Sequence, residues 1–185
     1  MHRFAAIDFE TADFGRDSAC ALAVVRVEGR RILGVSHHLI RPPRREFVFT
    51  YLHGISWEDV KDEPTFAELW PTLRRELDDA QFLVAHNAAF DRSVLHASCA
   101  RAGVAPPAHD FHCTVKIARQ VWGLRPANLP AVCAHLGIPL HHHRADSDAA
   151  ACARIFIEAL RCGGALPPVL GPRRAAPRRP RYLRT

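Results

Sequence analysis

The sequence predicts a single α/β domain whose sheet combines an antiparallel hairpin with parallel strands joined through helices. Three observations predict it. The chain opens with a short apolar segment, residues 4–8, that is typical of a buried central strand. Two longer apolar segments follow around a glycine turn. Beyond them, stretches with helical spacing alternate with short apolar runs. The length of 185 residues suits one domain with its own core.

The first three strands are predicted from apolar runs and turn residues. Residues 4–8 form the first, and residues 19–27 and 31–40 form the second and third. Glu28-Gly29-Arg30 between the latter two is a hairpin signal, and Pro42-Pro43 ends the third strand. We therefore expect strands two and three to pair as a hairpin.

A helix, a strand and a second helix are predicted next. Residues 65–77 carry apolar side chains at helical spacing, and a short strand follows at 81–85. The buried face of the first helix comprises Phe66, Leu69, Trp70, Leu73 and Leu77. A helix over about residues 90–102 ends at Gly103, a residue that favours helix ends. The 81–85 strand is expected to lie beside the first strand.

The last third of the chain predicts one strand and three helices. A brief strand over 111–113 leads into a helix that continues to Trp122. Asn128 is suited to cap a helix over 129–136, and a final helix covers about 147–160. The predicted order is β-β-β-α-β-α-β-α-α-α.

The positive charge is concentrated at the C-terminus. The formal net charge is +6, and residues 171–185 hold six arginines and no acid, so the remaining chain is formally neutral. Residues 166–185 are rich in proline and arginine and cannot bury a core, which predicts a disordered tail behind a domain of residues 1–165. The six scattered cysteines form no C-x-x-C pair and are expected to be reduced thiols.

No apolar run reaches the roughly 20 residues that cross a bilayer, and the N-terminus lacks the apolar stretch of a signal peptide. We therefore expect no membrane association and a cytoplasmic location.

Acidic residues stand where predicted elements begin or end. Asp8 and Glu10 lie two apart at the end of the first strand and can point into one pocket. Asp91 begins the helix after the 81–85 strand, and Asp148 begins the final helix. Because open α/β sheets place ligands at the carboxyl ends of their strands, we expect these four carboxylates to meet there.

Four neighbouring carboxylates repel one another, and divalent cations relieve that repulsion. A donor set made only of oxygen favours Mg²⁺ or Mn²⁺ over zinc. Two such ions can hold the attacking and leaving oxygens of a phosphoryl displacement. His143, five residues before Asp148, is placed in a loop and has the pKa range of a general base. The pattern indicates a two-metal phosphodiesterase.

Plainer interpretations exist for single residues. Asp91 and Asp148 could be helix-terminal acids that complement the helix dipole. His86 and Asn87 could satisfy backbone groups at a turn or contact substrate. Of the run His141 to His143, one member is expected to be functional and two to lie on the surface, because adjacent side chains diverge.

Three motifs together resemble those of the DEDDh, or DnaQ-like, 3′–5′ exonucleases: Ile7-Asp8-Phe9-Glu10-Thr11, His86-Asn87-Ala88-Ala89-Phe90-Asp91 and His143-x4-Asp148. This family includes the proofreading subunit of bacterial replicative polymerase, ribonuclease T and oligoribonuclease. The resemblance covers about residues 3–160 and implies a ribonuclease-H-like fold, a mixed five-stranded sheet flanked by helices.

The resemblance also implies roles for individual residues. Asp8 would bridge both metals, Glu10 and Asp148 would complete the tighter site, and Asp91 would serve the other. His143 would activate the attacking water. The remaining candidates, for substrate binding, are Thr11, His53, Gly54, Ile55, Asn87 and Phe90.

The predicted function is a metal-dependent 3′–5′ exonuclease that degrades single-stranded nucleic acid, DNA favoured, to nucleoside 5′-monophosphates. Two alternatives stay open: a non-catalytic single-strand-binding or polymerase-associated module, and an oligoribonuclease-like enzyme acting on short RNA or dinucleotides. A DNA polymerase is a candidate partner, although the tail does not resemble the polymerase-binding extension of the proofreading subunit. The sequence leaves the oligomeric state open, monomer or homodimer.

Overall fold

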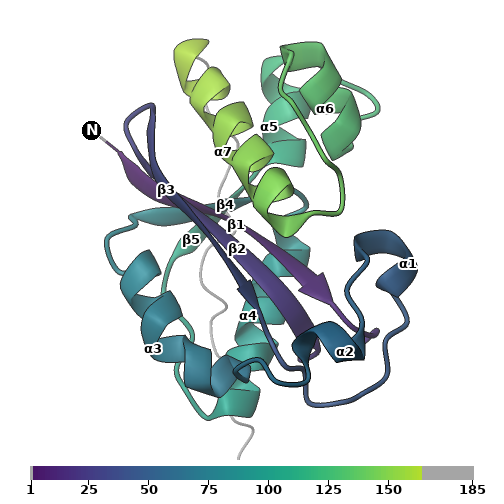
Figure 1. Cartoon of the computed structure of the whole chain (residues 1–185). Coiled ribbons are helices and arrows are strands. Elements are labelled where there is room, and N and C mark those ends of the chain that lie inside the picture. The colour runs from purple at the N-terminus through teal and green to yellow at the C-terminus, as the bar shows by residue number, and fades with distance from the viewer. Residues whose placement is uncertain (1, 164–185) are drawn as a thin grey trace, which may run out of the picture.

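The computed structural model describes residues 2–163, which form one five-stranded mixed sheet with helices on both faces (Figure 1). The strand order is β3-β2-β1-β4-β5. The strands are β1 (Arg3–Thr11), β2 (Ala19–Glu28), β3 (Arg31–Leu39), β4 (Phe82–Ala85) and β5 (Asp110–Cys113). β1 and β2 pair antiparallel, as do β2 and β3, whereas β4 runs parallel to both β1 and β5. The predicted hairpin and the placement of residues 81–85 beside the first strand are confirmed.

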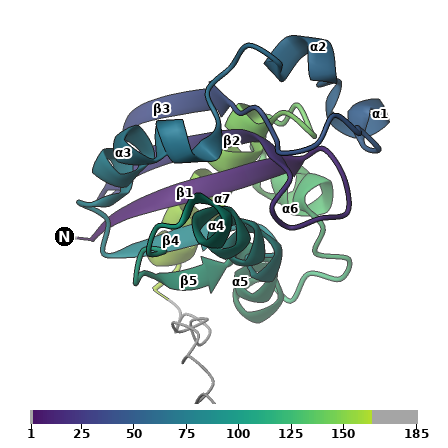
Figure 2. The same ribbon diagram turned by 90° about the horizontal axis from the view of Figure 1, so that it is seen from below.

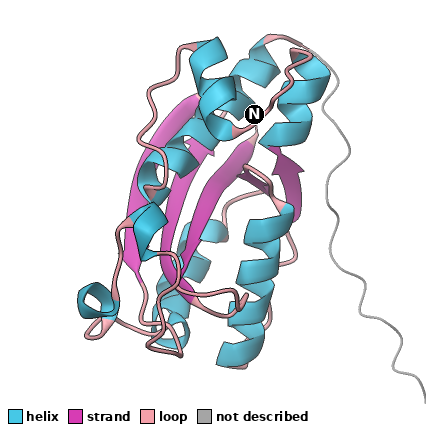
Figure 3. Cartoon of the chain, turned by 90° about the vertical axis from the view of Figure 1, so that its right-hand side faces the viewer, coloured by secondary structure: helices cyan, strands magenta, loops and turns pink. Residues whose placement is uncertain are grey.

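Two helical layers cover the sheet (Figure 3). Seven helices are described: α1 (Thr50–His53), α2 (Trp57–Val60), α3 (Phe66–Leu77), α4 (Ala89–Ala102), α5 (Thr114–Val121), α6 (Leu129–Leu136) and α7 (Ala145–Arg161). Helices α5, α6 and α7 lie together on one face, and α3 and α4 lie on the other (Figures 1 and 2).

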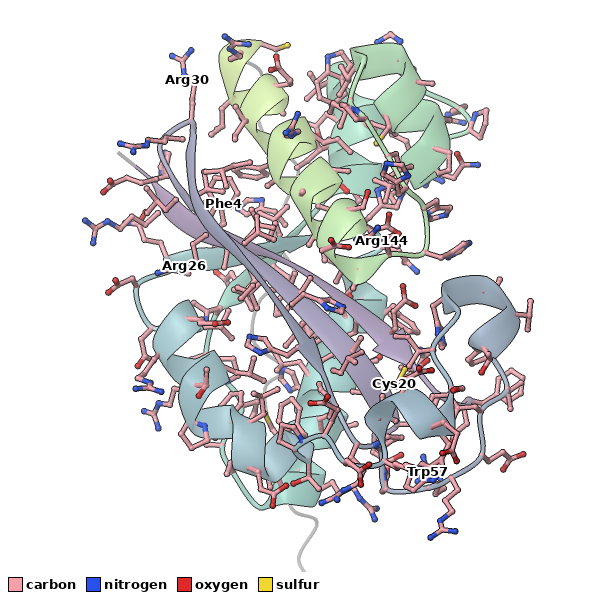
Figure 4. All side chains as sticks on the ribbon, in the orientation of Figure 1. Phe4, Cys20, Arg26, Arg30, Trp57 and Arg144 are labelled. Carbon is pink, nitrogen blue, oxygen red and sulfur yellow. The ribbon has the colours of Figure 1, made fainter. Side chains whose placement is uncertain are left out.

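Strand β1 contributes to both cores because its side chains alternate between the faces. Phe4, labelled in Figure 4, and Ala6 pack against the α5–α7 layer. The centroid of the Phe4 ring lies 4.8 Å from that of the Phe156 ring. Ile7 and Phe9 pack against the α3–α4 layer. Burial on both faces explains the nearly continuous apolar sequence of this strand.

Several element boundaries differ from the prediction. β1 continues to Thr11, three residues past the predicted end, because β2 pairs with it over its whole length. The four-residue helices α1 and α2 were not predicted, since one helical turn carries no periodic pattern. α7 begins at Ala145, two residues before the expected start.

The described cysteines are all free thiols, five buried and Cys162 exposed, as expected for reduced cysteines. Within residues 2–163, no helix is long and apolar enough to cross a membrane. The tail predicted at 166–185 lies outside the described residues.

Candidate active site

The first two acids of the site stand on the last part of β1. Asp8 and Glu10 share the α7 side of the strand with Phe4 and Ala6, because even-numbered residues point that way. The parallel pairing of β1 with β4 covers only Phe4 to Ala6. β1 therefore extends past the end of β4, and the backbone beyond Ala6 is free on that side for other partners.

Asp91 uses this free backbone. It lies in the first turn of α4, directly after β4, and its side chain is buried. The backbone N–H of Phe9 donates to Asp91 Oδ1 at 3.0 Å. A carboxylate thus takes the place of a strand neighbour, which holds Asp91 beside Asp8 and Glu10.

Asp148 comes from the opposite side, in the first turn of α7. Its Oδ2 accepts from two donors, His142 Nδ1 at 2.9 Å and the backbone N–H of His143 at 3.1 Å. Its Oδ1 is buried and has no hydrogen-bond partner among the described residues. An unpartnered buried carboxylate oxygen is costly unless a ligand completes it.

The four carboxylates line one pocket of about 320 Å³. Its other lining residues are Phe9, His86, Asn87, Phe90, Asn128, Leu129, His142 and His143. The sequence prediction that these acids converge is confirmed by this shared lining. Three separate elements, β1, α4 and α7, supply them.

The electrostatics of the pocket oppose four free negative charges. Burial raises the pKa of Asp8 well above its usual range, and the charges of Asp91, Glu10 and Asp148 raise it further. Burial, with Asp148 and Asp91, raises the pKa of Glu10 to about 8. Burial raises that of Asp91 to about 7, despite the N–H donation from Phe9. Burial also raises the pKa of Asp148, although the hydrogen bonds from the His143 N–H and from His142 lower it.

These residues fit a divalent cation of the hard type. All the ligand atoms that they offer are carboxylate oxygens, and these groups repel one another when no cation is bound. Asp148 Oδ1 also has no hydrogen-bond partner among the described residues. Asp8, Glu10, Asp91 and Asp148 are the residues that would hold such ions.

His143 lies at the wall of this pocket, partly buried. Burial and the neighbouring His142 lower its pKa, so its imidazole is neutral and can accept a proton near neutral pH. His86 plays a different part. Its Nδ1 lies 2.8 Å from Thr114 Oγ1, and burial lowers its pKa to about 4, so the ring joins β4 to α5 as a neutral group. His86 also lines the carboxylate pocket, so its contact with substrate stays a prediction beside this structural role.

The predicted substrate loop is tied to the end of β1. His53 Nε2 lies 3.2 Å from the carbonyl oxygen of Thr11, and the N–H of Ile55 donates to His53 Nδ1 at 3.0 Å. Gly54 ends α1 with a φ of 76°, a conformation that favours glycine. None of these four residues lines the carboxylate pocket. Burial lowers the pKa of His53, and the neighbouring His143 lowers it further, so the loop lies near the histidine at the pocket wall.

The loop that follows β1 is braced by Arg44. Its Nε donates to Asp13 Oδ2 at 2.7 Å, and its Nη2 donates to Asp17 Oδ1 at 2.6 Å. The guanidinium holds the pKa of both acids below the usual range. The loop therefore has a defined shape next to the end of β1.

Asn87 and Phe90 line the pocket as predicted candidates. Asn87 has a φ of 59°, a left-handed conformation that asparagine tolerates better than most residues. The guanidinium carbon of Arg16 lies 4.5 Å from the centroid of the Phe90 ring. Arg16 therefore already occupies one face of that ring.

His142 is exposed at the surface, as expected, but its side chain does not diverge from that of His143. It lines the pocket, bonds Asp148 and stacks on His143 with ring centroids 3.9 Å apart. His143 has a φ of 66°, and this left-handed backbone turns two adjacent side chains to one side. The rule that adjacent side chains diverge applies to extended and helical backbone, and so it failed here.

Comparison with known proteins agrees with this geometry. The model of the RNase T family, described as exonuclease, matches residues 5–156. The chain belongs to this exonuclease family. The predicted membership of the DnaQ-like 3′–5′ exonucleases and the ribonuclease-H-like fold are thereby confirmed.

Two bacterial proteins are similar to this chain in sequence. The chain is 30% identical over 158 residues to the PolC-type DNA polymerase III of Thermotoga maritima, and the match covers 83% of this chain but only 12% of that protein. It is 29% identical over 165 residues to exodeoxyribonuclease 10 of Escherichia coli, covering 85% of this chain and 69% of the relative.

Solved structures share its fold. Exonuclease X in complex with 5′ overhanging duplex DNA has a TM-score of 0.72 and 26% identity, over 90% of this chain and 95% of that one. The nuclease domain of 3′hExo, a DEDDh family member bound to rAMP, has a TM-score of 0.76 at 19% identity, over 92% and 96% of the two chains. Divalent-metal dependence is general in this family, in agreement with the carboxylate pocket.

Proposed function

We propose that this exonuclease removes nucleoside 5′-monophosphates from the 3′ ends of single-stranded nucleic acid, DNA in preference to RNA, with two Mg²⁺ or Mn²⁺ ions and His143 as general base. The observation that carries the proposal is the pocket in which Asp8, Glu10, Asp91 and Asp148 meet beside His143. When bound, the cations would supply Lewis acidity and neutralise the developing negative charge.

The chain's own residues account for the remaining steps. The four carboxylates fix the geometry of the site, because they are anchored to three separate elements, β1, α4 and α7. His143 accepts the proton of the attacking water, a role that its neutral imidazole permits. Leu129 and Phe90 supply apolar walls to the pocket.

The substrate end is proposed to enter between the loop after β1 and the α1 loop. Both loops carry an exposed aromatic side chain, Phe14 at 78% and Tyr51 at 77% exposure. Phe14 meets Phe49 edge to face, with ring centroids 4.9 Å apart. Exposed rings on these segments support stacking on bases without reading their sequence. The two segments meet where His53 Nε2 lies 3.2 Å from the Thr11 carbonyl oxygen, and this contact at the end of β1 supports the predicted contact of Thr11 and His53 with the terminal nucleotide.

The preference for DNA is supported by the nature of the relatives. The names of the PolC-type DNA polymerase III and of exodeoxyribonuclease 10 refer to DNA, and the structure of Exonuclease X is that of a complex with duplex DNA. A role beside a polymerase remains part of the proposal, because the chain spans only about an eighth of the PolC-type relatives.

The test uses 3′- and 5′-labelled single-stranded DNA and RNA, a duplex with a recessed 3′ end, and a dinucleotide series, each with Mg²⁺, Mn²⁺ or EDTA. Metal-dependent shortening from the 3′ end, lost in Asp8→Ala while strand binding remains, is the expected result. Binding without cleavage by the wild type would instead establish the non-catalytic module. Cleavage restricted to dinucleotides would establish the oligoribonuclease-like alternative.

A further inference from the structure

Asp148 has an asymmetric environment. Both hydrogen bonds to its side chain end on Oδ2, from His142 Nδ1 at 2.9 Å and from the His143 N–H at 3.1 Å. Oδ1 is buried and has no partner among the described residues. Two donors from adjacent residues on one oxygen fix the rotation of the carboxylate, so that the free oxygen can face only one direction.

The same histidine also contacts the proposed base. The rings of His142 and His143 are stacked, with an angle of 22° between their planes. The turn that carries them is itself closed: Ser147 Oγ accepts from the N–H of His141 at 2.8 Å, and the His141 carbonyl accepts from the N–H of Arg144 at 3.2 Å. Arg144 lies at the start of α7 (Figure 4). These two hydrogen bonds hold the turn that carries the stacked histidine rings.

We propose that His142 is a positioning residue of this active site: it holds Asp148 Oδ2 so that Oδ1 is presented to a divalent cation, and it sets the ring plane of His143. This inference rests on the proposed function. A histidine suits the role because one side chain supplies both an N–H donor and a flat ring. Groups that orient metal ligands in this way typically change metal affinity by about 10- to 100-fold when removed.

A competing interpretation is a transition-metal site that shares Asp148 with the carboxylate pocket. His142, His143 and Asp148 each offer a ligand atom, and these atoms lie within 4.8 Å of one another. Two nitrogens and one oxygen form a set that Zn²⁺ accepts. The positioning role and the zinc site make different predictions for Mn²⁺.

Two substitutions separate the two functions of the ring. His142→Asn keeps an N–H donor near the position of Nδ1 and removes the stack. His142→Phe keeps the stack and removes the donor. His141→Ala is the matched control, because this neighbour is exposed and does not line the pocket.

The first measurement is Mn²⁺ binding to metal-stripped protein without substrate, by calorimetry or by loss of the free Mn²⁺ paramagnetic signal. His142→Phe is expected to weaken Mn²⁺ binding about 10- to 100-fold, whereas His142→Asn and His141→Ala stay within about threefold of the wild type. The second measurement is the kinetics on labelled DNA. We expect a lower kcat for both His142 variants at saturating Mn²⁺, with KM for DNA unchanged.

Two results would overturn the positioning role. One is wild-type Mn²⁺ affinity and kcat in both His142 variants. The other is loss of Zn²⁺ binding alone, which would assign the cluster to zinc. Failure of the proposed function has a different signature: the wild type would bind Mn²⁺ and hydrolyse no nucleic acid, while the binding series would still report on His142.

Discussion

Replacement of Asp91 by asparagine is expected to stabilise the metal-free protein while it disables the site. Asparagine has the shape of aspartate, and its Oδ1 can keep the 3.0 Å bond from the N–H of Phe9. The substitution removes a buried negative charge beside Asp8 and Glu10. Its amide also brings a donor to face their carboxylates. The predicted gain in stability therefore comes from charge and not from packing.

The magnitude follows from the pKa of Asp91, which burial raises from 3.8 to about 7. Each pKa unit corresponds to about 1.4 kcal/mol, so the full ionisation of this group in the fold costs on the order of 4 kcal/mol. The folded protein keeps this proton to a higher pH than the unfolded chain. The contribution of Asp91 to stability therefore falls as the pH rises from about 4 to about 7. Asp91→Asn has no carboxyl group at this position, so its stability does not fall in this way.

The assay is urea unfolding of both proteins in EDTA at pH 5, 6, 7 and 8. The advantage of Asp91→Asn should be small at pH 5 and reach a few kcal/mol at pH 7 to 8. Buried histidines such as His86, whose pKa is about 4, give the opposite pH dependence. They are present in both proteins, so they cancel in the difference.

Asp146→Asn is the control variant, because it removes a carboxylate that is partly exposed and paired with an arginine. The Asp146 side chain lies outside the pocket and is 35% exposed, and Arg144 Nη2 donates to its Oδ2 at 3.0 Å. Asp146→Asn should therefore bring no stabilisation at any of these pH values. With saturating Mn²⁺ the advantage of Asp91→Asn should shrink by about 2.7 kcal/mol, the amount by which a ligand at 100 times its Kd stabilises the protein that binds it. An Asp91→Asn protein no more stable than wild type at pH 8 in EDTA would refute the reasoning, as would an advantage of equal size at pH 5 and pH 8.

Three further predictions concern other parts of the chain. His143→Ala should slow turnover about 10²- to 10⁴-fold in single-turnover assays, with Mn²⁺ affinity largely kept; an equal loss of affinity would make His143 a ligand. Arg44→Ala leaves Asp13 and Asp17 without their guanidinium and should cost about 2 kcal/mol in urea unfolding at pH 7. Because Arg44 depresses the pKa of both acids, wild-type stability from these pairs is present above pH 4 and lost as the pH falls further, so the two proteins should converge in acid; a constant difference would argue against the ion pairs. Deletion of residues 171–185 should flatten the salt dependence of single-strand binding if the six arginines contact phosphates, and an unchanged slope would exclude that contact.

The sequence alone determined the order of the strands and of the longer helices, and it identified the four acids that line the pocket. The apolar run of β1, the hairpin turn at Gly29 and the helical spacing of α3 are local signals, and each was interpreted correctly. The three acidic motifs also depend only on neighbouring residues. Asp8 and Glu10 share a face because side chains alternate along any strand, whatever the rest of the fold does.

Only the tertiary structure decided how the acids are held. β4 ends before β1 does, which frees the N–H of Phe9 for Asp91, and no local pattern in either strand reveals this difference in length. Likewise, the left-handed φ of His143 turns two adjacent histidines to one side and brings His142 to Asp148. Backbone pairing and dihedral angles of this kind result from packing between distant segments. They therefore arise only once the chain has folded.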